Sequence, residues 1–418
     1  MRCDGGYVAA EGVCEGGGPG RRLIRSHAIV TPMPDPTEAP TPRAPMSLWC
    51  HKTPRAQRVD NPQHPIQNTK TPNTKHPNTT MPTLNRTITL LLCLAMCIAV
   101  GAGCGGPKRQ KRSHWAAAPR QAPLPPPRVD MPIDADLQAR AAEQLLAATQ
   151  HTDPIVRAHA IESVKRIGGE GSEDLILAAL EDKEGIVRFA GAMAAGERRI
   201  EAAYDRLLDM LEDPSASVQV AVRYALHRLG DYRRSHDLET FARHPRPQVR
   251  ANTVMVLGLL EEPSAVKILR HLQRDRDPAV ALQTAEALWR YGDMEGLKSL
   301  VAASQSAFPD YQIVALLAMV GPKDHRVIEH VRSQLTAEHT EVQLAAARAL
   351  GVLGEDLGYA IAQQAIRQPS PRLKVLAAMA FAEIGRSDAQ PLLKPLLDDE
   401  DADVRLAAAT ALLVLGSQ

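Results

Sequence analysis

A repeat of about 31 residues constrains this chain more than any other feature. The segment from Val156 to Gly168 carries a valine, a following arginine and apolar residues at helical spacing, and altered copies run to the C-terminus. With the valine as anchor, the steps between copies are 31 residues, except for one of 32 and one of 30 around Gln312. Nine copies at one period predict a repeat architecture. The anchors are Val156, Val187, Val218, Val249, Val280, Gln312, Val342, Leu373 and Val404.

The pattern after each anchor is that of an α-helix. Apolar residues recur four, seven, eight and eleven positions beyond the anchor, which is the spacing of one helix face and not the alternation of a strand. Glycine then stands where a left-handed residue would end the helix. These glycines are Gly168, Gly230, Gly292, Gly354, Gly385 and Gly416.

A second apolar run precedes each anchor, and breakers such as Asp153-Pro154 and Asp277-Pro278 separate the two runs. Each unit therefore reads as helix, tight turn, helix. One such hairpin cannot bury its apolar face alone, so neighbouring units must stack. We predict an all-α protein, an α-solenoid of about nine helix pairs over residues 134–418, with an extended concave face lined by the second helices.

The motif around the turns resembles HEAT repeats, in particular the short HEAT-like kind of bilin lyases. The resemblance covers roughly residues 135 to 418. It rests on Asp153-Pro-Ile-Val-Arg157 followed by Ala160, and on Asp403-Val-Arg405 followed by Ala408. It implies that the arginine after the anchor bridges adjacent repeats, here Arg157, Arg188, Arg250 and Arg405. The sixth copy departs most, because Gln312 and Ile313 replace the valine and arginine, so we expect irregular stacking there.

The net charge of +1 hides a division along the chain. Residues 1–130 hold 17 Lys/Arg and 7 Asp/Glu, whereas the remaining residues hold 32 and 41. An acidic array argues against a nucleic-acid groove, because backbone binding needs a basic face. All six cysteines lie at or before Cys104, which excludes disulfides, cysteine metal sites and a cysteine nucleophile in the array.

Residues 81–104 have the pattern of an export signal. Arg86 precedes an uncharged run from Thr87 to Gly106, whose apolar centre is too short to span a bilayer comfortably. The run leads into Ala102-Gly103-Cys104, which resembles the end of a bacterial lipoprotein signal, although Gly101 stands where leucine is usual. The resemblance implies lipidation of Cys104 and an extracytoplasmic, lipid-anchored location in the cell envelope. A cleaved secretory signal and a short membrane anchor are the alternatives.

Eighty residues precede this signal, and they are rich in Pro, Thr, Asn and Gly without any periodic pattern. We predict that residues 1–80 are disordered. An export signal works from a true N-terminus, so we also hypothesise that translation starts at Met81 and that residues 1–80 are not made natively.

Residues 105–133 are predicted to form a tether. Its basic cluster, Lys108 to Arg112, suits either anionic lipid or solvent, and Pro123 to Pro127 stiffen the chain. We expect Asp134 or Asp136 to cap the first helix from Leu137 onward. Pro395 should kink the first helix of the last repeat.

No catalytic constellation stands out. The acidic run Asp398–Asp401 with Asp403 permits Ca²⁺ but lacks the glycine turn of a calcium loop, so a solvated turn is preferred. The histidines are dispersed over the repeats: His227, His244, His271, His325 and His330. We therefore predict no catalytic, metal or cofactor site. Trp289 and Tyr291 suit the core better than a partner contact.

These features together favour a membrane-tethered, extracytoplasmic HEAT-like scaffold. It would bind a partner protein or peptide on its concave face. Two other classes stay open. One is a bilin-lyase-like enzyme, as the repeat family suggests, although an export signal argues against intracellular chemistry. The other is a HEAT-like nucleic-acid-binding protein, which the acidic array disfavours.

Overall fold

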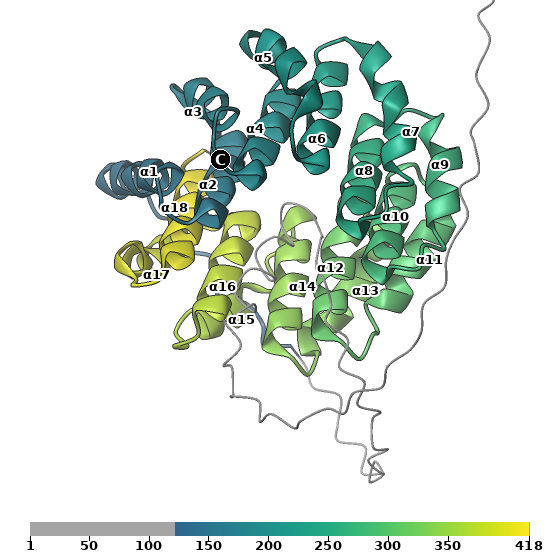
Figure 1. The fold of residues 1–418 in the computed structure, drawn as a ribbon. Helices are drawn as coiled ribbons and strands as arrows, with labels where there is room; N and C mark the ends of the chain where they lie inside the picture. The colour runs from purple at the N-terminus through teal and green to yellow at the C-terminus, as the bar shows by residue number, and fades with distance from the viewer. Residues whose placement is uncertain (1–121, 418) are drawn as a thin grey trace, which may run out of the picture. The chain divides into compact units, whose positions relative to one another are not determined.

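The computed structural model describes residues 122–417, which belong to the second of two units in the chain, Thr79–Gln418. This region is all-helical, and its helices alternate between two layers (Figure 1). The prediction of an α-solenoid of nine helix pairs is confirmed for these residues. The inner helices are α2 (Pro154–Ile167), α4 (Gly185–Arg198), α6 (Ala216–Arg228), α8 (Pro247–Leu260), α10 (Pro278–Arg290), α12 (Pro309–Met319), α14 (Thr340–Val352), α16 (Pro371–Ile384) and α18 (Ala402–Gly416).

Apart from α1, the helices of the outer layer are shorter, and several of them are extended by 3₁₀ turns. They are α1 (Ala135–Thr149), α3 (Ser172–Ala179), α5 (Tyr204–Asp209), α7 (Leu238–Phe241), α9 (Ala265–Leu272), α11 (Met294–Ala303), α13 (Ile328–Ser333), α15 (Tyr359–Ala365) and α17 (Gln390–Leu393). The 3₁₀ turns are η2 (Glu201–Ala203), η3 (Met210–Glu212), η4 (Tyr232–Asp237), η5 (His325–Val327), η6 (Gln334–Thr336), η7 (Ser387–Ala389) and η8 (Lys394–Asp398).

Local signals in the sequence set the ends of these helices. The Asp134 side chain accepts from the N–H of Leu137 and caps α1, as expected. Proline opens five of the inner helices, where its missing N–H costs nothing. Pro395 lies where α17 gives way to η8, in agreement with the predicted break. Gly416 departs from expectation, because it continues α18 instead of adopting a positive φ.

The two ends of the array meet. Helix α18 packs against α1 and α2, so the nine pairs close into a ring (Figure 1). The expected extended concave face is therefore the inner face of a ring. The core reflects this closure, because Leu137 of α1 belongs to the cluster built mainly from the last four repeats. Reciprocally, Leu406 of α18 belongs to the cluster built mainly from the first five repeats.

The sixth repeat is the weak point of the stack, as predicted. Helix α12 is the shortest inner helix, with 11 residues, and it packs less extensively on α10 than other inner neighbours do on each other. The anchor assigned to this repeat was wrong by one residue. Gln312 Nε2 donates to the carbonyl of Ser306, six residues earlier, as the arginine after the anchor does in regular copies. Tyr311 is therefore the anchor, and with it every step between anchors has the same length.

Candidate functional site: the inner face where the ring closes

An arginine in the second helix of a repeat links that repeat to the next one. Arg157 Nε and Nη2 each donate to Asp182 over 2.8 Å, and its Nη1 donates to the carbonyls of His151 and Thr152 in its own turn. Asp182 lies in the turn of the following repeat. Arg188 repeats this arrangement with Asp213.

Arg250 does the same with Asp275. Burial raises the pKa of the Asp275 carboxyl, but hydrogen bonds from Arg250 and the N–H of Asp277 outweigh it, so this pKa lies below its usual value.

The other copies keep only part of this link. Gln219 and Gln343 hold their own turn carbonyls but are too short to reach the next repeat. Lys374 instead donates across to Asp399, 2.6 Å away. Arg405 donates to the carbonyls of Asp399 and Glu400 in its own turn. All four arginines therefore hold their own turns, and Arg157, Arg188 and Arg250 also link neighbouring repeats.

The closing junction uses contacts without a counterpart at the other junctions of residues 122–417. Gln138 Nε2 of α1 donates to the carbonyl of Leu412 over 2.7 Å, and Thr410 Oγ1 donates to Ser163 Oγ over 2.8 Å. Gly416 leaves room for this approach, because a Cβ there would lie 2.6 Å from Gln138 Oε1. Helix α18 packs more extensively on α1 than on α2, as α10 packs more extensively on α11 than on α12, whereas at the remaining junctions the inner helices pack mainly on each other.

A cavity of about 610 Å³ lies on the inner face at this closure. Helices α2, α4, α14, α16 and α18 line it, so residues from the first two and the last three repeats meet there. Its walls are rich in charge and include two clusters of ion pairs. We take this inner cavity as the candidate functional site.

The first cluster joins the first repeat to the seventh and eighth. Arg166 binds the Glu383 carboxylate with two hydrogen bonds of 2.9 and 3.0 Å. Arg348 approaches the same carboxylate to 3.6 Å. One acid therefore faces two guanidinium groups, and Arg198 on the cavity wall adds a further, exposed cation. This side of the cavity favours an acceptor or an anionic group.

The second cluster surrounds one lysine. Lys165 Nζ lies 2.7 Å from Glu162 and 2.9 Å from Glu197. Burial raises the pKa of the Glu162 carboxyl, although Lys165 lowers it. Burial also lowers the pKa of the Lys165 ammonium, but the two carboxylates outweigh this and raise it above its usual value. Lys165 thus stays charged at neutral pH. Because two carboxylates share this one ammonium group, they can also accept a hydrogen bond from a donor group of a partner.

His159 completes the cavity wall. Its Nδ1 lies 3.4 Å from Asp403 Oδ1, and its buried Nε2 has no hydrogen-bond partner among the described residues. The histidine side chain is only 8% exposed. An unpaired buried nitrogen is costly. The cavity therefore offers cations and carboxylates to a ligand.

An outer groove of about 780 Å³ lies between the third, fourth and fifth repeats. It brings together His227 and His271, which the sequence suggested to be dispersed, and it adds His236. Burial lowers the pKa of the His227 imidazole, with Glu262 3.5 Å away acting in the opposite direction. Within residues 122–417 no group of three or more His, Cys, Asp or Glu side chains is placed to hold a metal ion.

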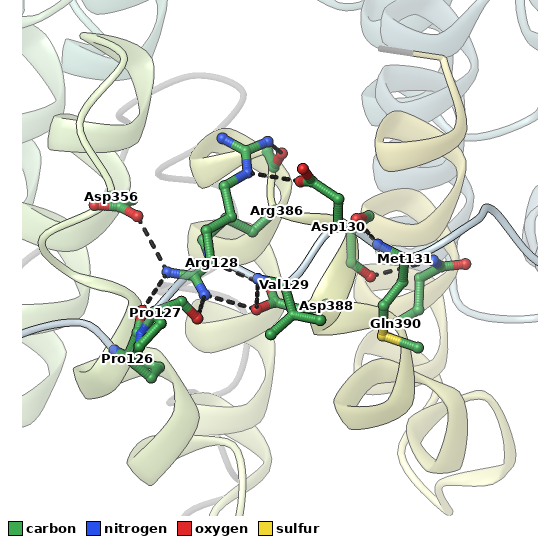
Figure 2. A network of polar contacts seen from close by, with 12 residues as sticks. Pro126, Pro127, Arg128, Val129, Asp130, Met131, Asp356, Arg386, Asp388 and Gln390 are labelled. Atoms are coloured by element: carbon green, nitrogen blue, oxygen red, sulfur yellow. Dashed lines mark hydrogen bonds and ion pairs between the residues drawn. The ribbon is translucent and has the colours of Figure 1, made fainter.

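The last part of the predicted tether lies on the array. We call residues 122–134 the strap. Arg386, fully buried, donates to the carbonyls of Pro126 and Pro127 over 2.9 Å each (Figure 2). The same guanidinium contacts Asp356 and Asp388 and lies 4.0 Å from the ring centre of Tyr359.

Three more side chains complete this attachment. Asp388, Ser387 and Gln390 accept from the N–H groups of Val129, Met131 and Asp134, respectively. The sequence pattern of the tether did not indicate any of these contacts, because the side chains that make them stand near the opposite end of the array.

The remaining candidates have structural roles. Asp401 caps α18, Asp398 pairs with Arg140 and Asp399 pairs with Lys374, so these three carboxylates of the acidic run each have a partner. Trp289 is buried and donates from Nε1 to the carbonyl of Met319, which confirms its core position.

Other candidates lie elsewhere. His244 accepts from the N–H of Arg246. His325 and His330 lie in η5 and α13, not in one helix. Cys104 and the signal segment lie outside the described residues.

Comparison with known proteins supports the repeat assignment. A family model described as HEAT repeats matches residues 142–227, 237–319 and 359–418, together more than half of the chain. No curated protein matches the sequence. None of the helices in residues 122–417 has the length and apolar character needed to cross a bilayer.

Similar solved structures include human deoxyhypusine hydroxylase in complex with glycerol, with 17% identity and a TM-score of 0.33, covering 68% of this chain and 98% of that one. The complex of CpcE and CpcF of phycocyanin lyase from Nostoc has 18% identity and a TM-score of 0.38, covering 57% and 98%. An engineered protein has 19% identity and a TM-score of 0.26, covering 67% and 93%. At this level of similarity no activity carries over from these proteins.

Proposed function

The chain belongs to the HEAT-repeat family, and from that premise we propose that it is a lipid-anchored scaffold that binds a partner protein beside a membrane. The partner would enter the inner cavity with a polar segment. The single observation that carries this proposal is that cavity, because five helices from both ends of the array converge there with charges of both signs. Such a surface suits a peptide, which carries donors and acceptors along its backbone.

The inner cavity favours binding over catalysis. Its Ser163 hydroxyl donates to the carbonyl of His159 and receives a hydrogen bond from Thr410, so it is not paired with a base as a nucleophile would be. The charged side chains are held by fixed partners, which limits the entropy that they lose when a ligand binds. Recognition by a preorganised polar surface is what we expect of a scaffold.

The membrane part of the proposal rests on the signal segment and Cys104. Two acyl chains on one cysteine would anchor the protein stably. Between Cys104 and the strap stand 17 residues, which extend at most about 60 Å. The anchor would therefore hold the ring close to the bilayer by the edge where the strap lies.

A photocrosslinking experiment tests the partner. A photoreactive amino acid replaces Arg198, which is exposed on the wall of the inner cavity, and in a second variant it replaces Glu173 on the outer helix α3. In the native host we expect one discrete crosslinked protein from position 198 and not from position 173. Arg166→Glu combined with the photoreactive residue at 198 should abolish that band. Equal crosslinking at both positions would contradict a specific inner-face site.

Mass spectrometry of the mature N-terminus tests the anchor. We expect a diacylated or triacylated Cys104 as the first residue. An unmodified N-terminus at another position, or a peptide from residues 1–80 in the native cell, would reject the anchor and the Met81 start respectively, without affecting the inner-face proposal.

A further inference from the structure

The strap carries an unusual share of the exposed apolar surface. Eight large hydrophobic side chains are exposed in residues 122–417, and four of them belong to the strap. They are Leu124, Val129, Met131 and Ile133. Leu124 is 83% exposed and Val129 57% exposed. Clustered exposure of this kind marks an interaction surface more often than a free one.

Leu124 and Val129 keep more than half of their surface exposed, whereas Met131 and Ile133 keep 37% and 39%. The array fixes the strap by polar contacts to its backbone, through the carbonyls of Pro126 and Pro127 and the N–H groups of Val129 and Met131 (Figure 2). Val129, Met131 and Ile133 alternate along the chain, and all three remain exposed. The strap therefore has a polar attachment to the ring and an apolar row available to something else.

The charge of the sequence next to the apolar row indicates what the strap contacts. Residues 105–128 contain six Lys or Arg and no Asp or Glu, and the exposed Asp130 that follows pairs with Arg128. A basic segment followed directly by exposed aliphatic side chains matches an anionic lipid surface, where cations pair with headgroups and apolar groups enter the interface. An acidic partner protein would use the charges but would leave the aliphatic row unexplained. The same segment also follows the proposed anchor, which would keep it within reach of the bilayer.

We propose that the strap is a membrane-contact element: its apolar row, Leu124 to Ile133, lies in the headgroup region of an anionic bilayer. This contact deepens the membrane location proposed above but does not depend on acylation of Cys104. Because Arg386 fixes the strap to the ring, the contact also sets one orientation of the ring. The edge formed by η7 and the strap faces the bilayer, and the ring does not tumble freely on its tether.

Methionine oxidation of the full wild-type chain tests this contact, since the chain contains its own control. Met131 in the strap is 37% exposed and Met294 on α11 is 44% exposed, so both react with dilute hydrogen peroxide in solution. On phosphatidylglycerol-containing vesicles, isolated by flotation, we expect oxidation of Met131 to slow at least about fivefold, because lipid excludes the oxidant, while that of Met294 is unchanged.

Substitutions test whether the apolar row itself, and not attachment to vesicles alone, protects Met131 from oxidation. In the variant Leu124→Gln, Val129→Gln, Ile133→Gln, Met131 of the floated protein should oxidise at its solution rate. The matched variant Leu146→Gln, Phe308→Gln changes exposed apolar residues elsewhere and should keep the protection.

Unprotected Met131 in floated wild-type protein would overturn the proposal, and so would a failure of the wild-type chain to float. The measurement is made on the bound fraction, so an unlipidated Cys104→Ala chain should give the same result. Loss of the anchor is thereby distinguished from loss of the contact.

Discussion

An ordinary junction in this ring and the closing junction solve the same packing problem by different means. Between the first and second repeats, an arginine fork from Arg157 spans to Asp182, and the same fork recurs one repeat later at Arg188. At the closure, Gln138, Gly416 and the strap make contacts without a counterpart in the other described repeats. The arginine fork recurs between regular repeats, whereas the contacts at the closure occur at one place only in the described residues. The two junctions should therefore fail in different ways.

The largest effect is expected from breaking an ordinary junction at Arg250. The Arg250→Ala substitution leaves the Asp275 carboxylate buried without its guanidinium. We expect the free energy of unfolding to fall by about 3–5 kcal/mol, measured by urea denaturation. Gln219→Ala is the matched control, because Gln219 occupies the same position but only holds its own turn. It should cost about 1 kcal/mol. Similar losses in both variants would show that the inter-repeat pair contributes nothing special.

The Arg250–Asp275 pair also predicts how the stability of the protein falls at acid pH. The pKa of Asp275 is lower in the folded protein than in the unfolded chain, so its contribution is complete above the unfolded value of about 4. That contribution is lost as the pH falls through the lower folded-state pKa. Denaturation midpoints measured between neutral pH and pH 3 should thus fall more steeply for the wild type than for Arg250→Ala. Parallel curves would contradict this assignment.

The closing junction should respond next most strongly, at Arg386. Replacing this residue with alanine removes both bonds to the strap carbonyls and leaves Asp388 with fewer partners. We expect a loss of about 2–3 kcal/mol. We also expect faster trypsin cleavage after Arg128, because the strap is released while the ring stays folded. A protease pattern identical to that of the wild type would show that the strap is held by other contacts.

Two glycines compare the junctions directly. A Cβ on Gly196 of α4 would lie 2.6 Å from Ala225 Cα, which cannot move without its helix. Gly196→Ala should therefore cost about 1–3 kcal/mol. A Cβ on Gly416 meets the side chain of Gln138, which can rotate away, so Gly416→Ala should cost less than about 1 kcal/mol. Thermal unfolding of the two variants side by side checks the difference. A larger loss at Gly416 would mean that the closure is the more rigid junction.

The smallest effect is expected at Arg140, which pairs with Asp398 across the closure at 3.0 Å. Both side chains are substantially exposed, so Arg140→Ala should cost less than about 1 kcal/mol, and this difference should vanish at high salt. A salt-independent loss would show that the arginine stem, and not its charge, holds the closure.

The sequence predicted the ordinary junctions well because their information is local and repeated. The spacing of Val156 and its equivalents defined the helix pairs, and Asp134, Pro154 and Gly168 marked helix ends that the structure confirms. The misplaced anchor at Gln312 has a physical reason. Tyr311 is aromatic and only partly buried, so it did not resemble the small buried valines of the other copies.

The inner cavity was not predictable in the same way. Arg348 and Glu383 come from the neighbouring seventh and eighth repeats, but Arg166 comes from the first, and no spacing along the chain relates it to them. Each is an ordinary helix residue in the sequence. They meet only because the ring closes, which depends on the small rotation between repeats added over all nine units. A rotation slightly larger or smaller at each junction would leave an open superhelix.

The sequence alone determined the helix pair, its period of about 31 residues, the array of nine units and the basic, apolar segment that precedes it, because helical periodicity and turn chemistry act over a few residues. Only the tertiary structure decided that the array closes, that Arg386 captures the strap and that charges from distant repeats share one cavity. Closure of the ring depends on many small packing angles added together, and the contacts that it creates join groups from opposite ends of the array. No local sequence pattern determines the total of these angles.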